Sequence, residues 1–431
     1  MCYSVMKELL FTLLFLGFTA AVSAQEIRPI NQPDELQILE SYFRLAAENN
    51  PELNSLRLEV EAQREQIPQV RALPDPEITA GYYINPENEA NISGRFSVTA
   101  MQMLPWFGTL SARGELEENI SEVMAYSLTA RQLEIFSEIQ DMWFQYFRLN
   151  HHIHINSDII QIIEDLENLV EVRYESGRTG QADILRLQME RQRLLNIIEQ
   201  LEDEKNPIRI RLNSLLNRNL SDNISVPMQL PERILAMSKD ELFNIAQSRH
   251  PDFDRLNAQR NQFKNQLDLA RLEGLPAVGI GLQYMGTDFG MMSMMDLDPV
   301  FIGMASINIP LYRGKYRAQR REARLQLQSI DEREIEVQNR FQSEIEKSMK
   351  KLRDGQRNYQ LITEELLPRT EQVLDILSDE YSSGQIQFDE MLQVLRELLA
   401  LENEKVEALT TQNKAMAEIE QLIGNELLSN E

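Results

Sequence analysis

Soft sulfur donors are concentrated in one short segment in the second half of the chain. Five methionines fall within eleven residues and a sixth follows them: Met285, Met291, Met292, Met294, Met295 and Met304. Thioethers suit Cu(I) or Ag(I), and a loop could place two or three of them on one ion. Methionine also fills irregular apolar space without binding a ligand, and this is its commoner role. Met291, Met292, Met294 and Met295 are therefore candidate soft-metal ligands, weighed against that simpler alternative.

Histidine is also unevenly distributed along the chain. Three of the four histidines are His151, His152 and His154, and the first and last lie three residues apart on one helical face. That spacing is compatible with metal binding. No carboxylate or cysteine motif completes a site, so a solvated helix face is the simpler interpretation. The sequence has no P-loop, GxSxG, HExxH or paired-cysteine motif, and we expect neither an enzyme nor a bound cofactor.

The composition excludes several other classes of protein. The 431 residues include 43 Lys and Arg against 68 Asp and Glu, a net charge of −25, and one cysteine. Nucleic-acid binding needs a basic surface, a disulfide framework needs paired cysteines, and a helical membrane protein needs apolar runs of about 20 residues. The longest apolar stretch, Leu9 to Val22, follows Lys7 and precedes Ala24. This pattern predicts a signal peptide over residues 1–24 and an exported protein.

An internal repeat organises the rest of the chain. The clearest match aligns Tyr174 to Leu185 with Tyr381 to Leu392, where Tyr, Gly, an acidic residue and Leu recur at a constant offset of 207. Earlier matches follow the same order, beginning with Asn50-Pro51-Glu52 against His250-Pro251-Asp252. A collinear series of this kind is strong evidence for two structural repeats, which we place at residues 25–230 and 231–431.

Each repeat predicts two β-strands followed by a long helical hairpin, so the fold class is mainly α with a small β part. The strand-like runs are about 8 to 11 residues long and cover 77–84, 95–104, 277–285 and 301–311. That length suits a tilted strand that crosses a bilayer. Membrane strands alternate apolar residues outside with polar or small residues inside. The second run does so, with Phe96, Val98 and Ala100 set against Arg95, Ser97 and Thr99.

The helical hairpins are predicted over residues 109–218 and 315–424. The stretch after Leu116 lacks Pro and Gly as far as Gly177, and the stretch from Lys315 to Gly384 is broken only at Gly355 and Pro368. Glycine commonly ends a helix, so the two hairpin glycines mark the turns. The returning helices carry heptad seams at Leu187, Leu194, Leu201, Ile208 and Leu215, and at Val394, Leu401, Ala408, Ala415 and Leu422. Such seams predict packing along neighbouring helices.

Four membrane strands imply an oligomer. Backbone groups cannot remain unpaired in hydrocarbon, and only a closed barrel satisfies them. Four strands cannot close, because about eight strands form the smallest barrel, whereas three copies of the chain would supply twelve. Long hairpins that continue from such a barrel would assemble into a helical tube. A tube joined to a barrel is a conduit.

The sequence resembles the TolC-like outer-membrane efflux family over nearly the whole exported chain. The resemblance rests on Asn50-Pro51-Glu52, the break at Leu73-Pro74-Asp75-Pro76, both strand pairs and the two hairpin motifs that begin at Tyr174 and Tyr381. It implies a homotrimer with a 12-stranded β-barrel in the outer membrane, continued by an α-helical tunnel through the periplasm. It also implies a periplasmic adaptor and an inner-membrane pump as partners, and no enzymatic activity.

The stretch from Gln102 to Gly108 is most similar to the branch that serves heavy-metal efflux, the CzcC and CusC type. The resemblance therefore implies passive conduction of heavy-metal cations to the exterior. Two alternatives within the same fold are efflux of drugs or other organic toxins and type I secretion. A third is a non-channel periplasmic scaffold or adaptor, in which the long helices form a coiled-coil spacer.

The resemblance also assigns roles to residues near the hairpin turns. Family members narrow the tunnel with acidic residues six positions after each hairpin glycine, here Asp183 and Glu390, with Asp389 adjacent. A ring of carboxylates in a narrow mouth would attract cations. The alternative is that they are acidic residues in the first turn of a helix, where the helix dipole favours them. The hairpin turns are assigned to Tyr174, Gly177, Tyr381 and Gly384, and the resemblance implies that the adaptor docks at these residues. Family members can carry an arginine two residues after the second hairpin glycine, whereas this chain has Ile386 at that position.

Aromatic residues follow the strands where the barrel would meet the helices. Trp106 and Phe107 occupy this position in the first repeat and Tyr312 in the second. Aromatic side chains are enriched at membrane–water interfaces, because they combine an apolar ring with a polar edge. We expect them to contact lipid at this interface, with ordinary packing at the base of the barrel as the alternative.

Overall fold

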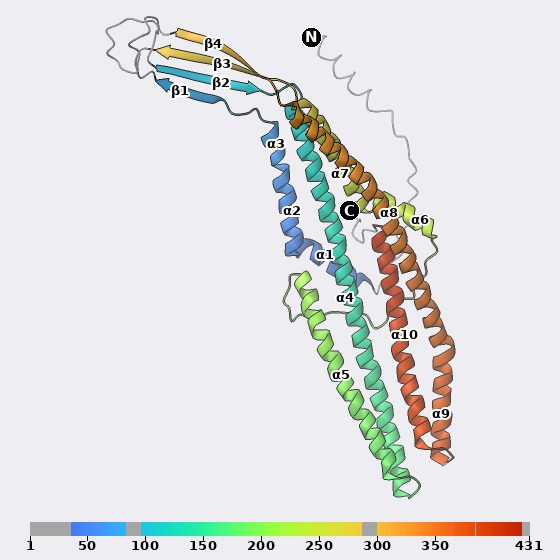
Figure 1. Ribbon diagram of the computed structural model, residues 1–431. Helices are drawn as coiled ribbons and strands as arrows, with labels where there is room; N and C mark the ends of the chain where they lie inside the picture. Colours follow the sequence, from blue (N-terminus) through green and yellow to red (C-terminus); the bar gives the residue numbers. More distant parts are fainter. Residues whose placement is uncertain (1–35, 83–95, 287–299, 384, 425–431) are drawn as a thin grey trace, which may run out of the picture.

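The computed structural model describes residues 36–82, 96–286, 300–383 and 385–424. The predicted signal peptide therefore lies outside the described residues. A four-stranded sheet forms one end of the molecule, and long helices run from it to the other end (Figure 1). Among the described residues, no helix is both long and apolar enough to cross a membrane. The predicted class, mainly α with a small β part built from a duplicated unit, is confirmed.

The strands of the two repeats form one antiparallel sheet in the order β1-β2-β3-β4. The strands are β1 (Glu77–Tyr82), β2 (Phe96–Leu104), β3 (Ala277–Gly286) and β4 (Val300–Asn308). Because β2 pairs with β3, the repeats join at the centre of the sheet. The strand predicted to reach residue 311 ends three residues earlier. Pro310 has no N–H to donate to a strand ladder, which is consistent with this shorter strand.

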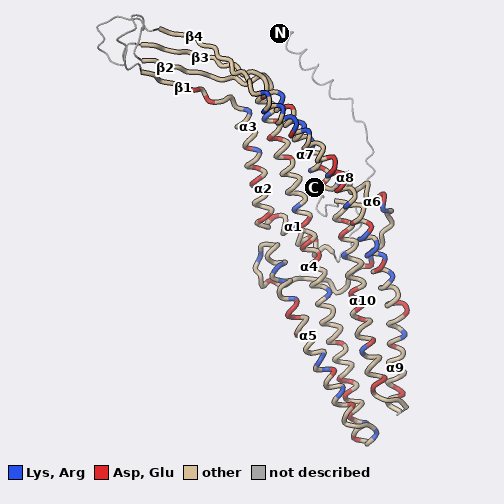
Figure 2. The backbone as a smooth tube through the Cα atoms, viewed as in Figure 1, with Lys and Arg blue, Asp and Glu red and all other residues tan. Residues whose placement is uncertain are grey.

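The sheet has two chemically different faces. In β3, Val278, Ile280 and Leu282 are exposed on one face, while Gly279, Gly281 and Gln283 lie on the other. The register places mostly apolar residues of β2 and β4 beside these residues of β3, and Gln102 of β2, beside Ile280, is the polar exception. No residue of β2, β3 or β4 is charged, and charges appear where the helices begin (Figure 2). This alternation is the pattern of a barrel strand with lipid on one side and a lumen on the other.

The first hairpin consists of α4 (Thr109–Glu175) and α5 (Gln181–Leu215). With 67 residues, α4 is about 100 Å long. The seam residues Leu187 and Leu194 of α5 are fully buried. The heptad pattern thus marks the face of α5 that packs along the neighbouring helices.

The second hairpin consists of α8 (Arg313–Gln360), a π-helical turn (Leu361–Leu366), α9 (Leu367–Ser383) and α10 (Phe388–Leu422). Helix α8 continues through Gly355. Glycine is needed there for close helix packing: a Cβ would lie 3.0 Å from the Gln412 nitrogen and 3.1 Å from the Ala408 oxygen of α10. The irregular turn instead precedes Pro368, which cannot donate a helical hydrogen bond.

Shorter helices lie beside the long ones, from the sheet to the middle of the molecule (Figure 1). They are α1 (Gln37–Asn49), α2 (Pro51–Arg64), α3 (Gln66–Arg71), α6 (Lys239–Arg249) and α7 (Pro251–Leu272). A cluster of buried aromatic residues, including Phe43, Trp143 and Phe144, ties α1 to α4. The Trp143 indole donates a hydrogen bond of 2.9 Å to the carbonyl of Ser225. This bond fixes the segment between α5 and α6 against α4.

The repeated X-Pro-acid motif begins a helix in each repeat. Asn50 caps α2 by accepting hydrogen bonds from the backbone of Glu52 and Leu53. His250 caps α7, with its Nδ1 accepting from the backbone of Asp252 at 3.2 Å. In both helices proline occupies the first turn, where no N–H is needed. The motif therefore recurs because both side chains present an acceptor to a helix N-terminus.

Replacing His250 by Asn is expected to make the protein less sensitive to acid. Burial lowers the pKa of His250 to about 4, from an ordinary 6.5. The unfolded chain takes up this proton below about pH 6.5 and the folded chain only below about pH 4, so stability falls by up to about 3 kcal/mol through this window. Asn preserves the cap and has no such proton. Melting temperatures between pH 7 and 4.5 should fall less for the variant, whereas parallel curves would contradict the account.

Candidate gate at the hairpin tips

The two hairpin turns lie at the end of the molecule farthest from the sheet (Figure 1). Gly177 adopts a φ of +69°, the left-handed conformation that ends α4. Gly384, the predicted turn of the second hairpin, lies outside the described residues. Both hairpins thus end at the same pole, and α5 and α10 begin there.

The three acidic residues assigned to the aperture lie in the first turns of α5 and α10. Asp183 is half-buried and accepts a hydrogen bond from the Thr179 hydroxyl. Asp389 and Glu390 are exposed. These positions fit both earlier interpretations, since a carboxylate here faces the tip and also complements the helix dipole. Their role in cation selectivity stays a prediction.

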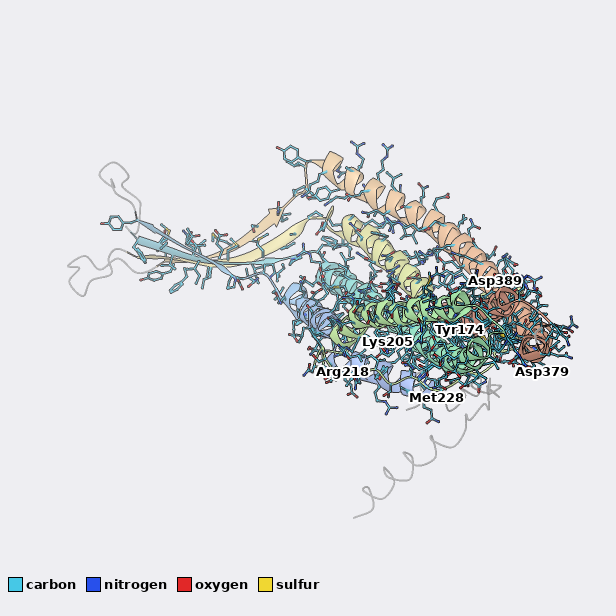
Figure 3. All side chains as sticks on the ribbon, turned by 90° about the horizontal axis from the view of Figure 1, so that it is seen from below. Tyr174, Lys205, Arg218, Met228, Asp379 and Asp389 are labelled. Atoms are coloured by element: carbon cyan, nitrogen blue, oxygen red, sulfur yellow. The ribbon has the colours of Figure 1, made fainter. Side chains whose placement is uncertain are left out.

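An arginine that the sequence analysis missed connects the acidic residues of the two hairpins. The Arg186 guanidinium lies 2.6 Å from the Asp389 carboxylate and 3.7 Å from that of Asp183. Arg186 belongs to the first hairpin and Asp389 to the second; Asp389 is labelled in Figure 3, which is viewed from below. The tip is therefore a mixed-charge contact between hairpins and not an array of carboxylates alone.

A second ion pair joins the hairpins one helical turn farther along. Both carboxylate oxygens of Glu190 accept hydrogen bonds from Arg396, at 3.1 and 2.6 Å. The Glu190 side chain is only 10% exposed. Arg396, with a smaller contribution from Arg193, holds the pKa of Glu190 below its ordinary value, so this carboxylate stays charged at neutral pH.

The two tyrosines at equivalent repeat positions have different environments. Tyr381 is 2% exposed, with the Arg173 guanidinium 4.3 Å from its ring centre and its hydroxyl 3.4 Å from the Thr179 hydroxyl. Tyr381 therefore packs between the hairpins. Tyr174 is 46% exposed, which leaves it available to a partner. Adaptor docking at these turns remains a prediction.

The aromatic residues assigned to the membrane interface lie between strands and helices. Phe107 and Tyr312 are 91% and 86% exposed. Trp106 is less exposed and lines a pocket at the junction of sheet and helices, together with Arg113 and Tyr316. The high exposure of Phe107 and Tyr312 is consistent with contact with lipid. The lower exposure of Trp106 is consistent with packing at the base of the sheet.

The histidine cluster is not a solvated helix face, so that interpretation is wrong for two of its members. His151 and His152 are half-buried, and burial lowers the pKa of each. The His151 ring packs 4.1 Å from that of Phe147. Within the part of the chain that the structure describes, no group of three His, Cys, Asp or Glu residues could hold a metal ion. The candidate ligands Met291, Met292, Met294 and Met295 lie outside the described residues.

A family model matches part of the chain. Residues 43–218 match the family model described as outer membrane efflux protein. No curated protein matches the sequence. The family description agrees with the predicted outer-membrane location and with the expectation that the chain is not an enzyme.

Solved structures extend the likeness to most of the chain. The channel CusC is 16% identical with a TM-score of 0.76, over 90% of this chain and 92% of CusC. VceC of Vibrio cholerae is 14% identical with a TM-score of 0.74, over 90% and 96%. MtrE of Neisseria gonorrhoeae, solved in its open state, is 15% identical with a TM-score of 0.71, over 90% and 88%. The chain therefore has the fold of outer-membrane efflux channels.

Proposed function

We propose that three copies of this chain form the passive outer-membrane channel of a tripartite efflux system. The observation that carries the proposal is the two-faced sheet, whose edge strands β1 and β4 have no partner within the described chain. Pairing β4 of one copy with β1 of the next would satisfy both edges in the membrane. Twelve strands from three copies would close a barrel. The hairpins of the three copies would then form the periplasmic tunnel.

The ion pairs between hairpins are proposed to keep the periplasmic end narrow. Arg186–Asp389 and Arg396–Glu190 hold α5 against α10 near the tip. Opening would separate the hairpins near Gly177 and Gly384, which requires these contacts to break. The driving force for transport would come from an inner-membrane pump, joined through a periplasmic adaptor that contacts the tips.

Heavy-metal cations are the proposed substrates. The net charge of −25 and the acidic residues at the tip favour cations over anions. The segment from Gln102 to Gly108 resembles the heavy-metal branch. Organic toxins or secreted polypeptides are the alternative substrates for the same channel.

Deletion of the gene tests the substrate. The deletion strain should accumulate copper and silver, or zinc, cobalt and cadmium, and should grow poorly in the same metals. Growth and total cell metal are measured in parallel with a set of dyes and detergents, and a plasmid copy of the gene serves as the control. Sensitivity only to dyes and detergents would remove the metal assignment and leave the channel in place.

A further inference from the structure

Methionines gather on the face of the sheet that carries small and polar residues. In the strand register, Met101 of β2 and Met304 of β4 lie on either side of Gly281 in β3. Met103 and Ser306 flank Gly279 in the same way. All of these residues share the face opposite to Val278 and Ile280. If the apolar face contacts lipid, this face lines the channel.

Gly279 and Gly281 of β3 leave space that sulfur atoms fill. A Cβ at residue 279 would lie 2.7 Å from the Met103 sulfur and 3.3 Å from the Met101 sulfur. A Cβ at residue 281 would lie 3.0 Å from the Met101 sulfur. Both sulfurs are also 3.8 Å from the Ser306 hydroxyl oxygen. The sulfurs of Met101 and Met103 therefore converge over one small area of the sheet.

The surroundings of this area suit a soft cation. Met101, Met103 and Met304 are each half-buried, so solvent or an ion can reach them. Glu77 of β1 is paired with Met101 in the register and lies on the same face. A carboxylate there would attract a cation, while the thioethers select a soft one.

We propose that Met101, Met103 and Met304 form a thioether site for a soft monovalent cation, Cu(I) or Ag(I). The site lies toward the helix end of the sheet. An ion that moves from the tunnel into the barrel would therefore reach this site. It rests on the proposed function, because only a channel places this face around a path. It also narrows the substrate class from heavy metals in general to soft monovalent ions. Bound ions must leave, so a few exchangeable thioether ligands suit a conduit better than a closed site.

The test uses the full chain in detergent, labelled with [methyl-13C]methionine and titrated with silver nitrate in chloride-free buffer. The resonances of Met101, Met103 and Met304 are assigned by single Met→Leu variants, which keep the side-chain volume nearly constant. We expect these resonances to shift together at low silver. The triple variant M101L/M103L/M304L should lose silver affinity by more than about tenfold.

Matched variants decide which methionines bind. Met228 is 79% exposed and remote from the sheet, so M228L should leave silver binding unchanged. The variant M291L/M292L/M294L/M295L should retain the shifts at the three sheet methionines. The site would be overturned if the quadruple variant lost silver binding while M101L/M103L/M304L retained it. It would also be overturned if silver did not shift the resonances of Met101, Met103 and Met304.

Pore formation separates this proposal from the proposed function. Each variant is also reconstituted in planar bilayers, where conductance should equal that of the unaltered chain. Conducting channels without silver shifts would overturn the thioether site alone. Absence of conductance in the unaltered chain would overturn the channel and, with it, the role of the site in transport.

Discussion

Replacing Arg396 by Glu is expected to raise single-channel conductance several-fold. The substitution removes the two hydrogen bonds to Glu190 and places two carboxylates in contact across the hairpins. Loss of attraction and gain of repulsion would cost about 1–4 kcal/mol per copy in the closed state. Three copies multiply the effect, and each 1.4 kcal/mol shifts an equilibrium about tenfold. The open tip should therefore become the major state.

Two variants control for this result. Arg191 has carboxylates of the same hairpin as its nearest ionic partners, Glu164 and Glu167 at 3.9 and 3.6 Å, so R191E should leave conductance unchanged. The exchange E190R/R396E restores opposite charges across the hairpins and should restore low conductance. An unaltered conductance in R396E, or an exchange variant as open as the single variant, would contradict a gate formed by this pair.

Replacing Arg233 by Met is expected to destabilise the protein by about 3–5 kcal/mol, as the loss of one partner of a buried ion pair does. Arg233 donates to Glu420 of α10, and the two side chains are only 5% and 7% exposed. Burial raises the pKa of Glu420, and the Arg233 guanidinium counteracts this. Without Arg233, the carboxylate would be left buried and unpaired. The segment between α5 and α6 would then lose its ionic link to α10.

The melting temperature of purified protein measures this loss. The double variant R233M/E420M removes both charges and should recover most of the stability, since apolar side chains can replace a buried pair. The exposed pair Arg369–Glu365 gives the matched surface control, and R369M should change stability by less than about 1 kcal/mol. Equal effects of R233M and R369M would show that burial of the pair has no part in stability.

The strands and hairpins could be predicted because their signals are local. Strand length, the alternation around Phe96 and the heptad seam through Leu187 depend only on nearby residues. Because the chain contains a repeat, each of these elements is also predicted twice. Gly355 could not be placed from sequence in the same way. A glycine within a helical stretch can either end the helix or allow a neighbouring helix to pack closely. Only the position of α10 shows that Gly355 has the second role.

The gate contacts could not be predicted because they join hairpins about 200 residues apart in sequence. Arg186 and Asp389 meet only once the two tips lie side by side. The repeat also suggested equal roles for Tyr174 and Tyr381, yet only Tyr381 is buried between the hairpins. Two similar segments in a chain need not have similar neighbours. Likewise, Met101 and Met304 are brought to one area by the pairing of β2 and β4 with β3, and local sequence signals do not reveal which strands pair.

Planar-bilayer recording of the purified, unaltered chain tests the central claim most directly. We expect discrete conductance steps that prefer cations over anions, from a species with the mass of three copies in detergent. Cation preference should weaken when Asp183, Asp389 and Glu390 are replaced together by Asn or Gln. A monomer that forms no pores would contradict the account.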